Sequence, residues 1–304
     1  MNAIIEEIER VGNLDDIVRE ALMTGETLFV ERPDPLTSKE AEKRVQPDCL
    51  RVVTILEILQ HFIGGLKKSS KPARGLEIGT GYGGLIMSLG KVFGGWEWHG
   101  VEHPERRYLK DARYHELMRA HGCRLIQCDI VKDGLPFPNN YFTVVTFSEV
   151  LEHLPLGSVH LVIGELSRVL CPGGVLLCSS PNLAMTLNRV RLLFGKAILD
   201  VPLPLDYAGG TFGHIRLYTA GEFVALAKPF GMKVATIRYQ RRMGNRLTAR
   251  SPLKKAAVWL FNLFDSFIST WFKEFSDTWY VMLKKEQVVP IESQEITAVP
   301  LTGR

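Results

Sequence analysis

The sequence predicts an α/β fold in which helices cover a largely parallel sheet, and three observations support this prediction. From Arg74 onward, short apolar runs alternate with segments of helical periodicity, the pattern of parallel sheets covered by helices. A glycine-rich turn follows the first apolar run, where a strand passes into a helix. Hydrophobic residues make up 46% of the chain and charged residues 23%, as in ordinary globular proteins.

The elements follow one another in a regular order along the chain. Residues 1–70 predict a helical addition, which a polar stretch, "GGLKKSSKPA", separates from the rest. Residues 71–285 predict the α/β domain, and residues 286–304 predict a tail. The predicted strands are 74–79, 96–102, 123–129, 141–149, 173–180, 232–240 and 278–285. One predicted helix of this domain begins at Gly83, and two others span 105–122 and 157–170.

Composition excludes several classes of protein. A net charge of +4 is too small to indicate nucleic-acid binding, so we expect no nucleic-acid partner. The five cysteines show no metal-ligand spacing and no HExxH occurs, so we expect no metal. Scattered cysteines and the acidic start "MNAIIEEIER" predict a cytoplasmic protein without a signal peptide. The sequence does not indicate an oligomeric state.

The stretch "GLEIGTGYGG" contains a GxGxxG pattern at Gly79, Gly81 and Gly84. Glycines allow a positive φ and let backbone N–H groups approach a ligand closely. Glu102 follows 18 residues after Gly84 at the end of the second predicted strand, where an acid can hold two ribose hydroxyls. Both a nicotinamide dinucleotide and S-adenosylmethionine satisfy this pattern.

Two further acids favour S-adenosylmethionine. Glu77 lies two residues before Gly79, where a carboxylate would repel a pyrophosphate but suit an ammonium or a sulfonium group. Asp129 ends the third predicted strand, where it can accept a hydrogen bond from an adenine amino group.

Two longer stretches are more specific. "DGLPFPNNYFTVVTFSEVLEHLP" and "LSRVLCPGGVLLCSSPN" resemble class I S-adenosylmethionine-dependent methyltransferases, in particular those acting on small molecules and on lipid- or sugar-linked acceptors. The resemblance implies a Rossmann-like sheet of order 3-2-1-4-5-7-6 with strand 7 antiparallel. It implies methyl transfer by in-line displacement, with S-adenosylhomocysteine as the product. It also implies an insertion over about 182–218 that forms part of the acceptor pocket.

The resemblance also implies a set of cofactor-binding residues. Glu77 would steer the ammonium end, Glu102 would bind the ribose, and Asp129 with the Ile130 backbone would bind adenine. The full set is Glu77, Gly79, Thr80, Gly81, Tyr82, Gly83, Glu102, Asp129, Ile130, Phe147 and Ser148.

The acceptor side is predicted from fewer residues. His214 and His153 are the candidate catalytic groups, and Arg216, Tyr218 and Asn188 are candidates for binding the acceptor. A hydroxyl acceptor benefits from a general base, so O-methylation is the favoured reaction. Each histidine has a structural alternative, His153 at a helix start and His214 in fixing a loop. A partner protein that binds S-adenosylmethionine without turnover, or an NAD-dependent oxidoreductase, is the alternative function.

Residues 256–275 have large apolar side chains at three- and four-residue steps and predict an amphipathic helix. Between Arg238 and Phe264 there are seven bases and no acid. The favoured interpretation is that this helix packs on the sheet. The alternative is contact with the inner face of a membrane, where aromatic side chains enter the headgroups beside a cationic patch, in keeping with a lipid-linked or anionic acceptor.

Overall fold

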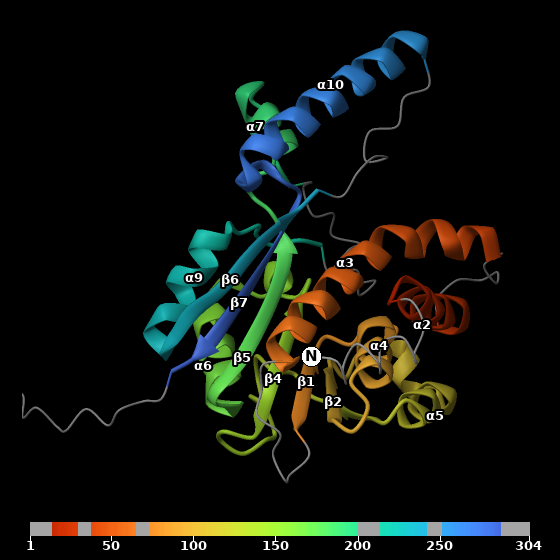
Figure 1. Ribbon diagram of the computed structural model, residues 1–304, viewed down its shortest axis with the longest axis vertical. Helices are drawn as coiled ribbons and strands as arrows, with labels where there is room; N and C mark the ends of the chain where they lie inside the picture. The colour runs from red at the N-terminus through yellow and green to blue at the C-terminus, as the bar shows by residue number, and fades with distance from the viewer. Residues whose placement is uncertain (1–13, 30–37, 65–72, 200–212, 242–250, 287–304) are drawn as a thin grey trace, which may run out of the picture.

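The computed structural model describes residues 14–29, 38–64, 73–199, 213–241 and 251–286. One seven-stranded sheet of order β3-β2-β1-β4-β5-β7-β6 forms its centre (Figure 1). The strands are β1 Arg74–Ile78, β2 Glu97–Glu102, β3 Cys123–Gln127, β4 Phe142–Ser148, β5 Leu170–Pro181, β6 Met232–Gln240 and β7 Thr278–Lys285. This order confirms the predicted fold class. The predicted tail beyond Glu286 lies outside the described residues.

Strand direction determines which residues meet at one edge of the sheet. β1 to β5 pair in parallel, and β7 runs antiparallel between β5 and β6. Ile78 pairs with both Val101 and Phe147, so the ends of β1, β2 and β4 lie level. Ligands bind at this carboxyl edge in open parallel sheets.

Helices cover both faces of the sheet. α3, α4 and α5 pack with one apolar cluster, and α6 and α9 pack with the other. The helix predicted over 105–122 is interrupted, because Asp111 has an extended backbone and caps the following helix by accepting a hydrogen bond from the Arg113 N–H. The α-helices are α2 Leu14–Phe29, α3 Ser38–Gly64, α4 Gly84–Val92, α5 Ala112–Ala120, α6 Val159–Val169, α7 Thr186–Leu193, α9 Ala220–Ala227 and α10 Pro252–Trp271. Short 3₁₀ helices, labelled η, are η1 Arg107–Lys110, η2 Leu151–His153, η3 Leu156–Ser158, η4 Lys228–Phe230 and η5 Lys273–Phe275.

The N-terminal part is helical where it is described. α2 packs against α3 and α4, next to the glycine turn. A Cβ atom added at Gly84 would lie 2.3 Å from Leu22 Cδ2, so only glycine permits this close approach. The N-terminal helices are therefore packed directly onto the turn after β1.

α10 does not pack on the sheet, so the favoured interpretation of residues 256–275 is wrong. It contacts mainly α7 and η5, and the two helices project beyond the end of the sheet towards which β5 runs (Figure 1). β6 is nevertheless largely exposed along its length. α3 reaches the end of this strand, where Gln240 Nε2 donates to Thr54 Oγ1 at 2.5 Å, and η5 contacts β6 more than α10 does. Among the described helices, none is long and apolar enough to cross a membrane.

Candidate cofactor and acceptor site

The glycine turn after β1 adopts the conformation that its sequence predicts. Gly79, Gly81 and Gly83 have φ values of 76°, 52° and 89°, which residues with a Cβ atom rarely adopt. A Cβ atom at Gly79 would also lie 2.6 Å from Val150 Cγ2, so the turn packs closely on the end of β4. At Gly81, by contrast, no described atom lies within 4 Å of the position of a Cβ atom. The turn therefore leaves open space beside its backbone, as a bound ligand requires.

Glu102 lies at the end of β2 and holds this turn. Its Oε2 accepts hydrogen bonds from the Gly81 N–H at 2.7 Å and from the Tyr108 hydroxyl at 2.9 Å. Its Oε1 accepts from the His103 N–H at 2.8 Å. The Thr80 hydroxyl also donates to Oε2 at 3.5 Å, and Arg106 Nε lies 3.7 Å from Oε1. The side chain sits where the ribose prediction requires it, and that role stays a prediction.

Asp129 follows β3 and is linked to the end of β2. The Val131 N–H donates to its Oδ1 at 3.1 Å, and Lys132 Nζ and His103 Nε2 lie 3.1 Å and 3.5 Å from its Oδ2. Burial raises the pKa of Asp129, but hydrogen bonds from Lys132 and Val131 outweigh burial and lower it. Asp129 is therefore a fixed anionic acceptor next to the backbone of Ile130.

A buried polar network closes the ends of β4 and β5. Ser148 Oγ lies 2.7 Å from Ser179 Oγ, and Arg51 of α3 donates from Nη1 to Ser148 Oγ at 2.7 Å. Ser179 Oγ also donates to Glu149 Oε1 at 3.3 Å. Glu149 has a φ of 57°, an unusual value for a residue other than glycine. Phe147 is fully buried, so only its backbone groups are available to a ligand, and its part in cofactor binding stays a prediction.

Glu77 is buried on β1, and its Oε2 has no hydrogen-bond partner among the described residues. Burial raises the pKa of Glu77 well above its ordinary value, and the Arg51 guanidinium lowers it only in part. An ammonium group is one donor that would satisfy such a carboxylate. This orphaned oxygen, together with the open space at Gly81, fits the methionine end of S-adenosylmethionine.

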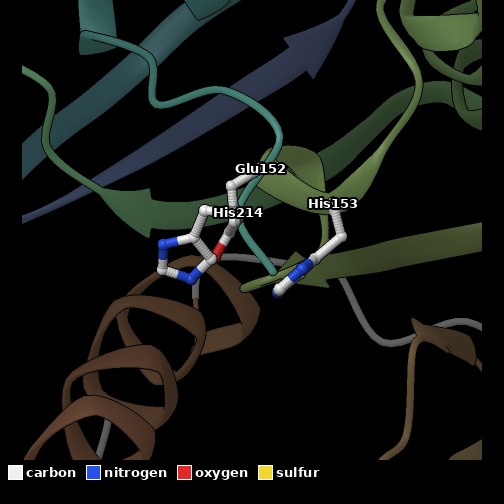
Figure 2. Close-up of side chains that lie close together, drawn as sticks. All are labelled: Glu152, His153 and His214. Atoms are coloured by element: carbon white, nitrogen blue, oxygen red, sulfur yellow. The ribbon is translucent and has the colours of Figure 1, made fainter. Parts of the chain in front are cut away.

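Glu152, His153 and His214 converge beyond the end of β4 (Figure 2). Each offers one ligand atom, and these atoms all lie within 4.8 Å of one another. The two imidazole rings have centroids 5.0 Å apart. Glu152 and His153 come from η2, directly after β4, whereas His214 comes from the segment before α9. The structure thus brings together the two predicted catalytic histidines and adds a carboxylate.

The ionisation of this cluster is set by its surroundings. Burial and the neighbouring Glu149 carboxylate raise the pKa of Glu152, which is only 1% exposed. Burial and the nearby His214 lower the pKa of His153. Ser180 Oγ donates to Glu152 Oε2 at 3.0 Å. Burial and the neighbouring His214 therefore favour an uncharged imidazole at His153, and they outweigh the Glu149 carboxylate, which raises its pKa.

Backbone hydrogen bonds hold His214 in place. The N–H groups of Ile215 and Arg216 donate to the backbone carbonyl of Glu152 at 2.8 Å and 3.3 Å. Two residues further on, the carbonyl of Tyr218 accepts from Trp279 Nε1 of β7 at 2.8 Å. The segment that carries His214 is therefore anchored both to η2 and to the sheet.

The other three predicted acceptor residues lie outside this cluster. Arg216 is 2.6 Å from Glu222 Oε1 and lies over the ring of Tyr218. Tyr218 is buried. Asn188 is 1% exposed, and its Nδ2 donates to the carbonyls of Asn182 and Leu183, so it stabilises the turn before α7. Acceptor binding by these residues stays a prediction. Residues 200–212 of the predicted insertion lie outside the described residues.

Four residues of the site were not predicted from the sequence. Tyr108 was missed because no sequence pattern indicates which tyrosine after β2 contacts Glu102. Arg51 was missed because it lies on α3, and nothing in the sequence indicates that α3 reaches β4. Glu149 and Glu152 were overlooked although both stand in "SEVLEHLP", where two acids beside a histidine were the available indication.

Comparison with known proteins identifies the family. The model of a methyltransferase domain family matches residues 54–237, more than half of the chain. The chain belongs to this family. An uncharacterised methyltransferase of Schizosaccharomyces pombe is 34% identical over 125 residues, which cover 39% of this chain and 43% of that protein. The match thus spans less than half the length of this curated relative.

Solved structures agree with the family at the level of the fold. The carbon methyltransferase CurJ superposes with a TM-score of 0.50 at 15% identity, covering 81% of this chain and 58% of that one. A methyltransferase dependent on S-adenosylmethionine from Archaeoglobus fulgidus has a TM-score of 0.49 at 14% identity, covering 80% of this chain and 99% of the other. The predicted class, a class I S-adenosylmethionine-dependent methyltransferase, is confirmed. The family match also decides for S-adenosylmethionine over a nicotinamide dinucleotide as the cofactor.

Proposed function

We propose that this methyltransferase domain moves a methyl group from S-adenosylmethionine to a hydroxyl oxygen of a lipid-linked acceptor at an anionic membrane surface. The observation that carries the proposal is an exposed apolar surface on α7 and α10. We call it the α7–α10 surface and define it by Leu193, Phe194, Trp259, Phe264, Phe267 and Trp271.

The α7–α10 surface exposes large apolar side chains that helices in contact with water usually bury. Leu193 is 81% exposed, Trp271 70% and Phe267 64%. On α10 the exposed positions recur at three- and four-residue steps, so they lie on one face of the helix. Large apolar patches on a surface mark interaction sites, and bulky aromatic residues on an amphipathic helix are typical of membrane interfaces.

The charges around this surface favour an anionic partner. Exposed or half-buried bases adjoin it at Arg191, Lys196, Lys255 and Lys273. α10 and η5 contain two acids, Asp265 and Glu274. The charge of Asp265 is compensated, because this carboxylate forms an ion pair with Arg241 at 2.6 Å. Each base near an anionic membrane contributes about 1 kcal/mol, and salt screens the attraction. The occupant that matches both the apolar and the basic character is an anionic lipid surface.

The position of the surface relative to the site supports a lipid-linked acceptor. β5 carries Ser179 and Ser180 at its carboxyl end, where they contact Glu149 and Glu152, and the chain then leads directly into α7. Figure 1 shows α7 and α10 beyond this end of the sheet. A membrane bound there lies on the same side as the acceptor cluster.

The chemistry requires placement more than side-chain reactivity. S-adenosylmethionine supplies an activated methyl group on a sulfonium. Glu77, Glu102 and Asp129 would hold its ammonium, ribose and adenine, and alignment of donor and acceptor contributes about 7–11 kcal/mol to such reactions. A hydroxyl must also lose its proton, for which a base contributes about 10²–10⁴-fold. The histidines beside Glu152 support a hydroxyl acceptor, and His214 as the general base stays a prediction.

Vesicle flotation tests the proposal. The full chain should float with vesicles of phosphatidylcholine and phosphatidylglycerol at low salt and dissociate as salt rises. A triple variant, Trp259→Ser, Phe267→Ser and Trp271→Ser, should remain unbound while keeping its affinity for S-adenosylhomocysteine. Leu161→Ser is the matched control, because Leu161 is 57% exposed but lies on α6. Absence of flotation by the unmodified chain, or equal flotation by the triple variant, contradicts the proposal.

A further inference from the structure

The cluster of Glu152, His153 and His214 has the composition of a metal site. One carboxylate and two imidazoles form the protein ligand set of several catalytic zinc and iron sites, which keep open positions for water or substrate. The ligand atoms lie within 4.8 Å of one another. In a tetrahedral site, two ligand atoms at about 2.1 Å from the ion lie about 3.4 Å apart, so the side chains would have to close by at most about 1.4 Å on binding.

A second observation is the orphaned oxygen of Glu152. Its Oε1 is buried and has no hydrogen-bond partner among the described residues, although Oε2 accepts from Ser180. The residue as a whole is 1% exposed. A buried carboxylate oxygen without a donor is costly unless a ligand completes it, and this one belongs to the three converging side chains in Figure 2.

A third observation is the orientation of His153. Its Nδ1 lies 3.3 Å from the carbonyl oxygen of Gly213, which fixes the proton on Nδ1 and leaves the lone pair on Nε2. Ligating histidines almost always donate their other ring N–H in this way. The same carbonyl belongs to the residue before His214, so one backbone segment orients one histidine and carries the other.

We propose that Glu152, His153 and His214 bind a divalent transition-metal ion, which in turn binds the oxygen of the acceptor hydroxyl. The metal site stands on its own geometry, and only the hydroxyl acceptor rests on the proposed function. In this proposal His214 holds the metal and does not act as the general base. A bound ion lowers the pKa of a coordinated hydroxyl, so the proton passes to solvent water at the exposed side of His214. The alkoxide oxygen then forms a bond to the methyl carbon. The electrons of the breaking S–C bond return to sulfur, which leaves neutral S-adenosylhomocysteine.

Cobalt is a suitable probe, because the visible absorption of Co²⁺ reports imidazole ligation. The full chain, without a histidine tag and treated with a chelator, is titrated with Co²⁺ alone. We expect one equivalent to bind with a visible band that Zn²⁺ displaces. His214→Ala and Glu152→Gln should each weaken binding by about tenfold or more. His160→Ala is the control, since His160 is exposed on α6 and outside the cluster.

The variants remain informative if one of them is unstable. His214 is exposed, so its truncation should leave the fold intact, and S-adenosylhomocysteine binding measures this independently of the metal. A chain that binds no Co²⁺, or a folded His214→Ala variant that binds as tightly as the unmodified chain, overturns the proposal. Vesicle flotation does not involve the metal, so either result leaves the membrane proposal standing.

Discussion

The cofactor end of the sheet and the α7–α10 surface place large side chains in opposite environments. At the cofactor end, Phe223 and Trp279 stack with 5.4 Å between ring centroids and are fully buried. On α10, Phe267 and Trp271 are neighbours with ring centroids 6.4 Å apart but remain 64% and 70% exposed. The same kind of aromatic pair therefore stabilises the fold in one region and is available to a partner in the other.

A matched pair of truncations should separate the two regions most clearly. Phe223→Ala should lower the free energy of unfolding by about 3–5 kcal/mol, because it leaves a cavity beside Trp279. Phe267→Ala should change it by less than about 0.5 kcal/mol, since its side chain is mostly in water. Urea denaturation of both variants measures the difference. A similar loss in the two would mean that α10 is part of the core.

Ligand binding should stabilise only the cofactor end. S-adenosylhomocysteine at 100 times its dissociation constant should add about 2.7 kcal/mol to the free energy of unfolding, and NAD at the same concentration should add nothing. Amide exchange should slow in α4 and at the end of β4 but not in α10. Thermal unfolding with each ligand is the first measurement, and equal shifts for both ligands would argue against the assigned cofactor.

Loss of the Glu102 carboxylate should weaken cofactor binding without unfolding the protein. Hydrogen bonds to a charged group contribute about 1.5–3 kcal/mol, so Glu102→Ala should raise the dissociation constant of S-adenosylhomocysteine by about 10–150-fold. Calorimetry on this variant and on Glu105→Ala, at an exposed neighbour, gives the comparison. Unchanged affinity in folded Glu102→Ala would remove Glu102 from the ribose site.

The smallest effect is expected at Arg216, whose partner Glu222 is also partly exposed. Exposed ion pairs contribute about 0.2–1 kcal/mol, so Arg216→Gln should change stability little. If Arg216 binds the acceptor, as the sequence predicts, methyl transfer should fall while the affinity for S-adenosylhomocysteine stays constant. Unchanged transfer at limiting acceptor would leave Arg216 with a structural role only.

Local features of the site could be predicted from the sequence. Gly79, Gly81 and Glu102 are recognised because a strand, a tight turn and a second strand follow one another within a short stretch. Asp129 is recognised for the same reason at the end of β3. The strand order came from a resemblance, since periodicity alone does not distinguish neighbouring strands.

Long-range features could not be predicted. Glu152 and His214 meet because the Glu152 carbonyl accepts hydrogen bonds from Ile215 and Arg216, and no spacing in the sequence indicates this contact. The environment of α10 was predicted wrongly because helical periodicity identifies an apolar face without saying what covers it. Here α10 lies against α7 and η5, and its apolar face is largely exposed.

Transfer of labelled methyl groups into lipid tests the central claim most directly. The full chain is incubated with methyl-labelled S-adenosylmethionine and a membrane extract of its source organism, and the label is then counted in organic and aqueous phases. We predict label in the organic phase. The triple variant of Trp259, Phe267 and Trp271 should lose most of this label, whereas Leu161→Ser should keep it. Label confined to the aqueous phase, or equal lipid labelling by the triple variant, would contradict a lipid-linked acceptor presented at the α7–α10 surface.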